Sequence, residues 1–361
     1  MENLPLSKPM VGGDGDHSYA KNSTYQGGAV DAAKSLISEA IIEKLDLKTL
    51  ELDTSKTFRI VDLGCSSGPN TFFAVQNIIE AVEQKFLLSE QQNPSALEFQ
   101  VFFNDHYDND FNTLFKSLPQ SRHYFAVGVP GSFHGRLFPN SSIHFVHSSY
   151  TLHWLSKVPR EIVDGNSPSL NEGSVKCNRF VKEVIEAYST QLKNDMESFL
   201  NARAQEVVHG GLMSLVIFAI PDGMPFADTR PGVVFGILHS CLTHLAKMGI
   251  ISEEKVTSFN VPMHNLTPKQ LEALIQTNGN FIIERMEKLG NPKKHVLLSS
   301  KGFASMMRAI LGGFIREHFG NEFVDQIFDH FTTKIEENYS IFREKGLNMV
   351  DLFILLKRVV S

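Results

Sequence analysis

Apolar residues along this chain of 361 residues gather in short runs, which are separated by stretches with helical periodicity. Five of the runs have the length and composition of strands that are buried on both faces. They occupy residues 58–63, 98–105, 123–129, 142–150 and 211–220. Helical patterns cover residues 29–45, 70–88 and 179–204. Strands that alternate with helices predict an α/β fold, a doubly wound and mostly parallel sheet with right-handed crossovers.

Two later apolar runs, at about 281–289 and 351–360, predict two further strands of the same sheet. We expect a single domain over residues 1–361, whose core sheet comes from about 57–220 and these two late strands. The remaining segments, 1–56, about 157–178 and 221–350, are loop-rich or helical in pattern. They predict an α-helical cap over the edge of the sheet where ligands bind.

The first strand ends in Asp62 and runs into a turn with Gly64, Ser66 and Gly68, after which a helix opens at Asn70. A strand, a glycine-bearing turn and a helix N-terminus form the nucleotide-binding corner of doubly wound sheets. The GxGxxG and GxxxxGK[ST] spacings are absent from the sequence, which argues against dinucleotides and against a P-loop. The turn suits a nucleoside without phosphates, such as S-adenosylmethionine. An ordinary βα loop is the alternative that this stretch leaves open.

Polar residues also lie at the ends of the second and fourth predicted strands. Asp105 closes the second strand, where an acid accepts hydrogen bonds from ribose hydroxyls, although a strand-end turn or a helix N-cap would also use it. The fourth strand leads into SSYTLHWLS, which holds Trp154, the one tryptophan of the sequence. Its indole N–H, beside His153, would bind one oxygen of a carboxylate, and the alternative is a core tryptophan.

Composition excludes several classes of protein. The net charge of −6, with no basic run, argues against a nucleic-acid binder. The absence of an apolar N-terminal core and of an 18-residue apolar segment leads us to expect a cytoplasmic protein. Three cysteines without CxxC spacing indicate neither a disulfide framework nor a thiolate zinc site. No Gly-x-Ser-x-Gly motif is present to anchor a hydrolase triad.

Seven segments resemble, in order and spacing, the motifs of the plant SABATH methyltransferases. They are GGDGDHSYAKNSTYQ, VDLGCSSGPNT, FFNDHYDNDFNTLF, GVPGSFHGRLFP, HSSYTLHWLSKVP, FLNARAQEVV and VTSFNVP. The resemblance covers essentially the whole chain. It implies a Rossmann-like methyltransferase sheet with a helical cap, S-adenosylmethionine as methyl donor, and a homodimer. The family methylates carboxylic acids such as salicylate, jasmonate and loganate, and ring nitrogens of xanthines.

The resemblance also implies roles for individual residues. Those that would hold S-adenosylmethionine are Tyr19, Ser23, Asp62, Gly64, Cys65, Asn70, Asp105, His106, Ser132, Phe133 and Tyr150. His106 departs from the leucine that is usual there. Those that would bind the substrate are Gln26, His153 and Trp154, with Tyr19 and Tyr150 bordering both sites. Gln26 and Trp154 would orient the carboxylate, and His153 would be a hydrogen-bonding neighbour or a weak base.

Some relatives bind magnesium, and the matching positions here are Asn171, Phe259 and Asn260. Thr257 stands where the aspartate of that motif should be. A hard cation prefers carboxylate ligands, so this replacement weakens the predicted magnesium site.

We therefore predict a carboxyl methyltransferase that forms methyl esters of a small plant acid by in-line transfer. Xanthine-type N-methylation and a catalytically silent nucleoside-binding relative are the alternatives. Apolar residues of the cap predict a hydrophobic, terpenoid-like pocket: Phe218, Met224, Phe226, Phe235, Met263, Met307 and Phe314. His239 and His264 would instead reach hydroxyls of a polar substrate such as an iridoid glycoside. Similarity favours the loganic and farnesoic acid branch.

Overall fold

The computed structural model describes residues 8–47, 50, 56–88, 97–163, 182–345 and 348–359. Within them seven strands form one mixed sheet in the order β3-β2-β1-β4-β5-β7-β6. The strands are β1 (Thr57–Leu63), β2 (Glu98–Asp105), β3 (Phe125–Pro130), β4 (Ile143–Ser149), β5 (Val207–Ala219), β6 (Phe281–Lys288) and β7 (Val350–Arg358). Strands β1 to β5 pair in parallel, whereas β7 lies antiparallel between β5 and β6. The predicted α/β, Rossmann-like sheet is confirmed.

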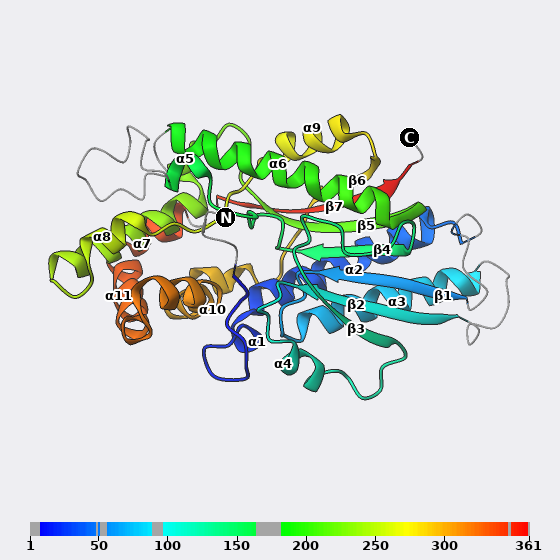
Figure 1. Ribbon diagram of the computed structural model, residues 1–361, viewed down its shortest axis with the longest axis horizontal. Helices are drawn as coiled ribbons and strands as arrows, with labels where there is room; N and C mark the ends of the chain where they lie inside the picture. The colour runs from blue at the N-terminus through cyan, green and yellow to red at the C-terminus, as the bar shows by residue number, and fades with distance from the viewer. Residues whose placement is uncertain are drawn as a thin grey trace.

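Helices cover both faces of this sheet (Figure 1). The longer ones are α2 (Thr24–Lys44), α3 (Asn70–Leu88), α6 (Lys182–Glu206), α7 (Arg230–Lys247), α9 (Pro268–Asn278), α10 (Ser300–Phe319) and α11 (Val324–Glu337). The short ones are α1 (Tyr19–Asn22), α4 (Phe111–Lys116), α5 (Arg160–Val163), α8 (Glu253–Ser258), α12 (Tyr339–Lys345) and the 3₁₀ turns Phe226–Asp228, Lys294–Leu298 and Asn321–Phe323. Helices α2 and α3 lie on one face, and α6 and α9 lie on the other. Helices α7, α8, α10 and α11 gather beyond the carboxyl ends of β1, β4 and β5.

The alternation of side chains along β1 explains why both faces need cover. Phe58 and Ile60 pack into the hydrophobic cluster beneath α2 and α3, and Val61 and Leu63 pack into the cluster beneath α6. All four are fully buried. A strand that is apolar on both faces requires a helical layer on each side, which is the layered α/β arrangement that the sequence predicts.

Two elements begin earlier than their patterns predict. Helix α2 starts at Thr24 rather than at residue 29, and its Gly28 lies so close to Asn291 and Lys293 that a Cβ atom would collide with them. Strand β5 starts at Val207 and continues through Gly210 and Gly211, where its pairing with β4 is irregular. In both cases glycines that resemble breaks in the pattern lie inside the element.

None of the helices in the described part of the chain is long and apolar enough to cross a membrane.

Candidate active site

A cavity of about 210 Å³ lies at the carboxyl ends of four neighbouring strands, and we call it the strand-end cavity. Its lining residues follow the strands in turn: Gly64 and Ser66 after β1, Asp105 and His106 at β2, Gly131 to His134 after β3, and Ser149 to Thr151 at β4. Tyr19 and Trp154 complete it from the N-terminal segment and the turn after β4. This position is where doubly wound sheets bind nucleosides.

The carboxylate of Asp105 is fixed by the backbone of two lining residues. The amide of Ser66 donates to Oδ2 and the amide of His106 donates to Oδ1, each at 2.7 Å. Burial raises the pKa of Asp105 to about 6, although the two amide hydrogen bonds lower it. Ser66 lines the same cavity, and its hydroxyl is buried without a hydrogen-bond partner among the described residues. An accepting carboxylate and an unpaired hydroxyl suit the hydroxyl groups of a ribose.

The backbone around this cavity has positive φ angles at several positions. Gly64 has a φ of 83°, and a Cβ atom there would collide with the methyl group of Thr151. Tyr150 has a φ of 53°, which is uncommon for a bulky residue. Such conformations persist only where the surrounding structure holds them, and they cluster at functional sites. For Tyr150, the side-chain contacts described below provide that support.

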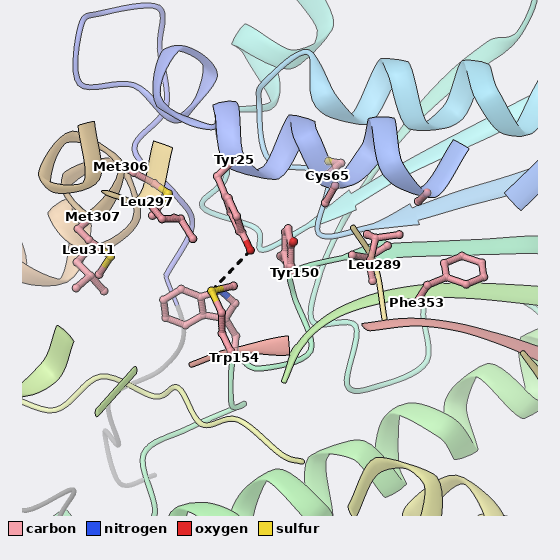
Figure 2. Close-up of a cluster of buried hydrophobic side chains, with 14 of the residues drawn as sticks. Tyr25, Cys65, Tyr150, Trp154, Leu289, Leu297, Met306, Met307, Leu311 and Phe353 are labelled. Atoms are coloured by element: carbon pink, nitrogen blue, oxygen red, sulfur yellow. Dashed lines mark hydrogen bonds between the residues drawn. The ribbon is translucent and has the colours of Figure 1, made fainter. Parts of the chain in front are cut away.

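A second cavity, of about 120 Å³, adjoins the first and extends toward the cap; we call it the apolar cavity. Met10, Tyr19, Tyr150 and Trp154 line both cavities. The rest of its lining is mostly apolar and comes from β5, α7, the segment between α8 and α9, the 3₁₀ turn Lys294–Leu298 and α10: Phe218, Pro231, Val234, Phe235, Met263, Leu297, Phe303, Met306, Met307 and Ile310. Figure 2 shows Leu297, Met306 and Met307 facing Tyr25, Tyr150 and Trp154.

Two polar side chains that the sequence assigns to the substrate open into the apolar cavity. Gln26 Oε1 and His153 Nδ1 are both buried, and neither has a hydrogen-bond partner among the described residues. Burial lowers the pKa of His153 to about 4, so the imidazole is neutral at neutral pH. Trp154 stacks on Phe314 with ring centroids 5.6 Å apart, and its ring lies 5.6 Å from that of His153. Buried polar atoms without partners are rare in folded proteins, so these two mark a place for a polar ligand group.

The wall shared by the two cavities depends on residues that the sequence analysis did not identify. Tyr25 stacks on Tyr150 at 5.7 Å, and both hydroxyls donate hydrogen bonds to the buried carboxylate of Asp351. Burial raises the pKa of Asp351, while the hydrogen bonds from the two tyrosines lower it. The sequence signal for Asp351 is an acidic residue near the start of an otherwise apolar strand. That signal was missed because Asp351 belongs to the last strand and is distant in sequence from every motif.

Arg230, at the start of α7, also lines the apolar cavity. Its guanidinium lies over the rings of Phe303 and Phe342, at 4.3 and 5.1 Å. Burial lowers its pKa to about 10, whereas the negative charge of Asp351 acts in the opposite direction. Its charge is therefore offset by aromatic faces and by Asp351 rather than presented alone to a ligand.

Four residues assigned to the methyl donor do not line either cavity. Asn70 donates to the Ser23 hydroxyl at 2.9 Å, which ties the start of α3 to the start of α2. Asp62 accepts a hydrogen bond from Thr71, and burial raises its pKa to about 7. Cys65 is buried, and burial raises its pKa. These four residues therefore lie in or near the turn after β1 without lining either cavity.

The predicted magnesium residues show no metal-binding arrangement in the described part of the chain. Asn171 lies outside the described residues. The Thr257 hydroxyl donates to the Glu253 carbonyl within α8, Phe259 packs against Phe319, and the Asn260 amide donates to the Ser258 carbonyl. Among the described residues no group of three His, Cys, Asp or Glu side chains is placed to hold a metal. The three described residues supply no carboxylate and do not fit a magnesium ion.

Four of the predicted apolar cap residues line the apolar cavity: Phe218, Phe235, Met263 and Met307. Met224, Phe226 and Phe314 do not line it, and neither does His239 or His264. His264 is buried and stacks on Phe226 instead. The lining thus contains neither of the two histidines that would bind the hydroxyls of a polar substrate.

Comparison with known proteins agrees with this geometry. The model of the family described as SAM dependent carboxyl methyltransferase matches residues 6–359. Loganic acid O-methyltransferase of Catharanthus roseus is 48% identical over 352 residues, which is 97% of this chain and 94% of that protein. Farnesoic acid carboxyl-O-methyltransferase of Arabidopsis thaliana is 43% identical over 334 residues, which is 92% of this chain and 94% of that protein. A solved structure of loganic acid methyltransferase with SAH has a TM-score of 0.91 and 46% identity, covering 98% of this chain and 99% of that one.

Proposed function

Because the chain belongs to the family of S-adenosylmethionine-dependent carboxyl methyltransferases, we propose that its acceptor is the carboxylate of an apolar, terpenoid-like acid. The observation that carries this proposal is the apolar cavity, whose mostly apolar lining includes the neutral side chains of Gln26, His153 and Trp154, and in which His153 Nδ1 is buried without a partner among the described residues. An apolar acid fills such a cavity with hydrocarbon and presents its carboxylate to the few polar groups.

The methyl donor belongs in the strand-end cavity. Asp105 would accept hydrogen bonds from the ribose hydroxyls, and Ser132 and Phe133 would flank the adenine. S-adenosylmethionine supplies a methyl group on a positively charged sulfur, which is already activated for transfer. Tyr19, Tyr150 and Trp154 line both cavities, so the methyl group would pass between ligands that these three side chains contact.

The acid needs no strong base, since a carboxyl group with an ordinary pKa near 4.3 is ionised at neutral pH. Gln26, Trp154 and His153 would orient it as neutral hydrogen-bond donors, because a carboxylate only accepts. A cation in their place would bind the carboxylate well but reduce its nucleophilicity. Holding oxygen, methyl carbon and sulfur in line at about 3 Å is worth several kcal/mol or more of the barrier. The buried, apolar surroundings keep water away from the ion.

The neutral His153 argues against the alternative of xanthine N-methylation. A ring nitrogen must lose a proton to become a good nucleophile, and a base with a pKa of about 4 takes that proton poorly at neutral pH. The lining of the apolar cavity also favours an apolar acid over a glycoside as the acceptor. Hydroxyl groups buried against methionine and phenylalanine side chains would lose hydrogen bonds to water without replacement.

The test is methyl transfer from labelled S-adenosylmethionine to farnesoic acid, loganic acid, salicylate and a xanthine, followed by mild base hydrolysis. We expect base-labile label, with kcat/KM for farnesoic acid on the order of tenfold or more above that for loganic acid. Preference for loganic acid would refute the apolar acceptor. Base-stable label on the xanthine would show N-methylation instead.

The homodimer and the cytoplasmic location stay predictions, which size-exclusion chromatography and a fluorescent fusion would check.

A further inference from the structure

The last turns of α6 carry the segment FLNARAQE, which the proposed reaction does not use. Phe199, Arg203 and Glu206 follow one another at spacings of four and three residues, so they lie on one face of the helix. Arg203 is 0% exposed and Glu206 is 1% exposed. Arg203 Nε donates to Glu206 Oε2 at 2.7 Å, which makes a fully buried ion pair.

This face of α6 packs against the loop 131–138, which follows β3 and has no regular secondary structure. Ser132, Phe133 and His134 of the loop line the strand-end cavity. The side-chain amide of Asn104 holds the loop at its start, donating to the carbonyls of Val129 and Gly131 at 2.7 and 3.0 Å. Beyond Gly131 the loop depends on α6.

The ion pair satisfies four backbone groups of the loop. Arg203 donates to the carbonyls of Phe133 and Gly135, both at 2.8 Å. Glu206 Oε1 accepts from the amides of Leu137 and Phe138. The backbone groups of this irregular loop have no partners within a helix or strand, and here one arginine and one glutamate satisfy four of them. The Phe133 ring also meets the Phe199 ring edge-to-face at 6.3 Å, and the Arg203 guanidinium lies 5.3 Å from the Phe199 centroid.

We propose that Arg203 and Glu206 are positioning residues for the methyl donor: they set the conformation of loop 131–138 and thereby the adenine-facing part of the strand-end cavity. This inference rests on the proposed function only in assigning that cavity to S-adenosylmethionine. Burying two charges is a poor way to gain stability, because desolvation offsets much of their attraction. A rigid planar fork that holds two carbonyls at fixed positions is what an arginine provides and a lysine does not.

The first experiment measures the affinity for S-adenosylhomocysteine, the demethylated form of the donor, by calorimetry on Arg203→Lys. We expect the dissociation constant to rise on the order of tenfold, because an ammonium lacks the planar fork that holds Glu206 and both carbonyls at fixed positions. The matched control is Arg358→Lys. Arg358 donates to the carbonyls of Ala204 and Asn280, so this change disturbs the same end of α6 without touching the loop. We expect the control to bind as the unchanged protein does.

A second variant, Glu206→Gln, keeps the shape of the side chain and removes the charge that faces Arg203; we expect a similar loss of affinity. Equal weakening in the Arg358→Lys control, or unchanged affinity in Arg203→Lys and Glu206→Gln, would overturn the proposal. No acid takes part in these measurements, so their outcome is independent of whether the proposed acceptor is right.

Discussion

Tyr150 donates a hydrogen bond to Asp351 at 2.9 Å across 201 residues of chain, and Tyr25 donates to the same carboxylate at 2.6 Å. The acid of the last strand therefore holds the two stacked rings beside which the strand-end cavity and the apolar cavity meet. Tyr150 needs this support, because its backbone is in the left-handed region. Asp351 is thus part of the site without lining either cavity.

Replacing Asp351 with alanine should leave two buried tyrosine hydroxyls without an acceptor, at about 1–3 kcal/mol each. We expect a lower melting temperature and a fall in kcat on the order of tenfold or more, measured with the best acid. Asp351→Asn keeps one carbonyl acceptor and should retain more activity than the alanine variant. The assignment fails if Asp351→Ala melts earlier but turns over the acid at the unchanged rate.

Gln26→Leu and Trp154→Phe remove polar groups while keeping most of the apolar volume. Each should lower kcat/KM for the acid by on the order of tenfold or more, because a hydrogen bond to a charged group is worth about 1.5–3 kcal/mol. Calorimetry should find little change in affinity for S-adenosylhomocysteine with Gln26→Leu. If that affinity falls as much as turnover does, Gln26 faces the donor rather than the acid.

Binding of the donor should depend on pH through Asp105. Its pKa is raised from 3.8 to about 6, so the folded protein without ligand takes up a proton there that the unfolded chain does not. This group's contribution to stability is present below pH about 4 and is lost as the pH rises through about 6. A ribose that donates to the carboxylate favours the ionised form. Affinity for S-adenosylhomocysteine should therefore fall by up to about tenfold between pH 7 and pH 5.

The matching control is Asp105→Asn, which should bind more weakly at pH 7 and lose most of this pH dependence. A profile that is flat between pH 5 and pH 7 in the unchanged protein would remove Asp105 from contact with the ribose.

Val233 and Val234 are neighbours on α7 and both are buried, but only Val234 lines the apolar cavity. Val234→Thr adds a hydroxyl at nearly constant volume, so kcat/KM for an apolar acid should fall several-fold, by about 1 kcal/mol of transition-state stabilisation. Val233→Thr adds the same hydroxyl outside the cavity and should leave kcat/KM nearly unchanged. Equal effects from the two changes would mean that helix stability, rather than substrate contact, is being measured.

Chelation of divalent metals should leave activity within about twofold, because the Thr257 hydroxyl bonds within α8 and supplies no charged ligand. Activity with and without a chelator, measured on the same acid, tests this. Activity that disappears on chelation and returns with magnesium would show that the site forms despite Thr257.

The parts of this structure that the sequence predicts are those set by neighbours in the chain. The strand and turn at 57–70 follow from local apolar content and glycines, and the ends of β1, β2 and β4 carry the polar residues expected there. The partners of distant elements do not follow in this way. The run at 351–360 predicts a strand, but neither its direction nor its place between β5 and β6, so Asp351 could not be connected with Tyr25.

The same limit applies to α6. Spacing alone places Arg203 and Glu206 on one helix face and indicates an i,i+3 pair, which is most often a solvated pair on a helix surface. Its burial against loop 131–138 depends on how helix and sheet pack, which no local pattern encodes. Glycine patterns are similarly ambiguous, because Gly28 and Gly211 lie within regular elements where a Cβ atom would meet neighbouring atoms.

Strand β7 is the last part of the site to be synthesised. All residues that line the strand-end cavity lie between Lys8 and Ser156. The carboxylate that accepts hydrogen bonds from Tyr25 and Tyr150 belongs to Asp351, which is synthesised much later. During translation, the ribosome therefore releases all residues of the strand-end cavity long before the strand that bonds Tyr25 and Tyr150 emerges. A nascent chain therefore contains every residue of the strand-end cavity early, yet Tyr150 in its wall gains its carboxylate partner only when residues 350–358 insert between β5 and β6.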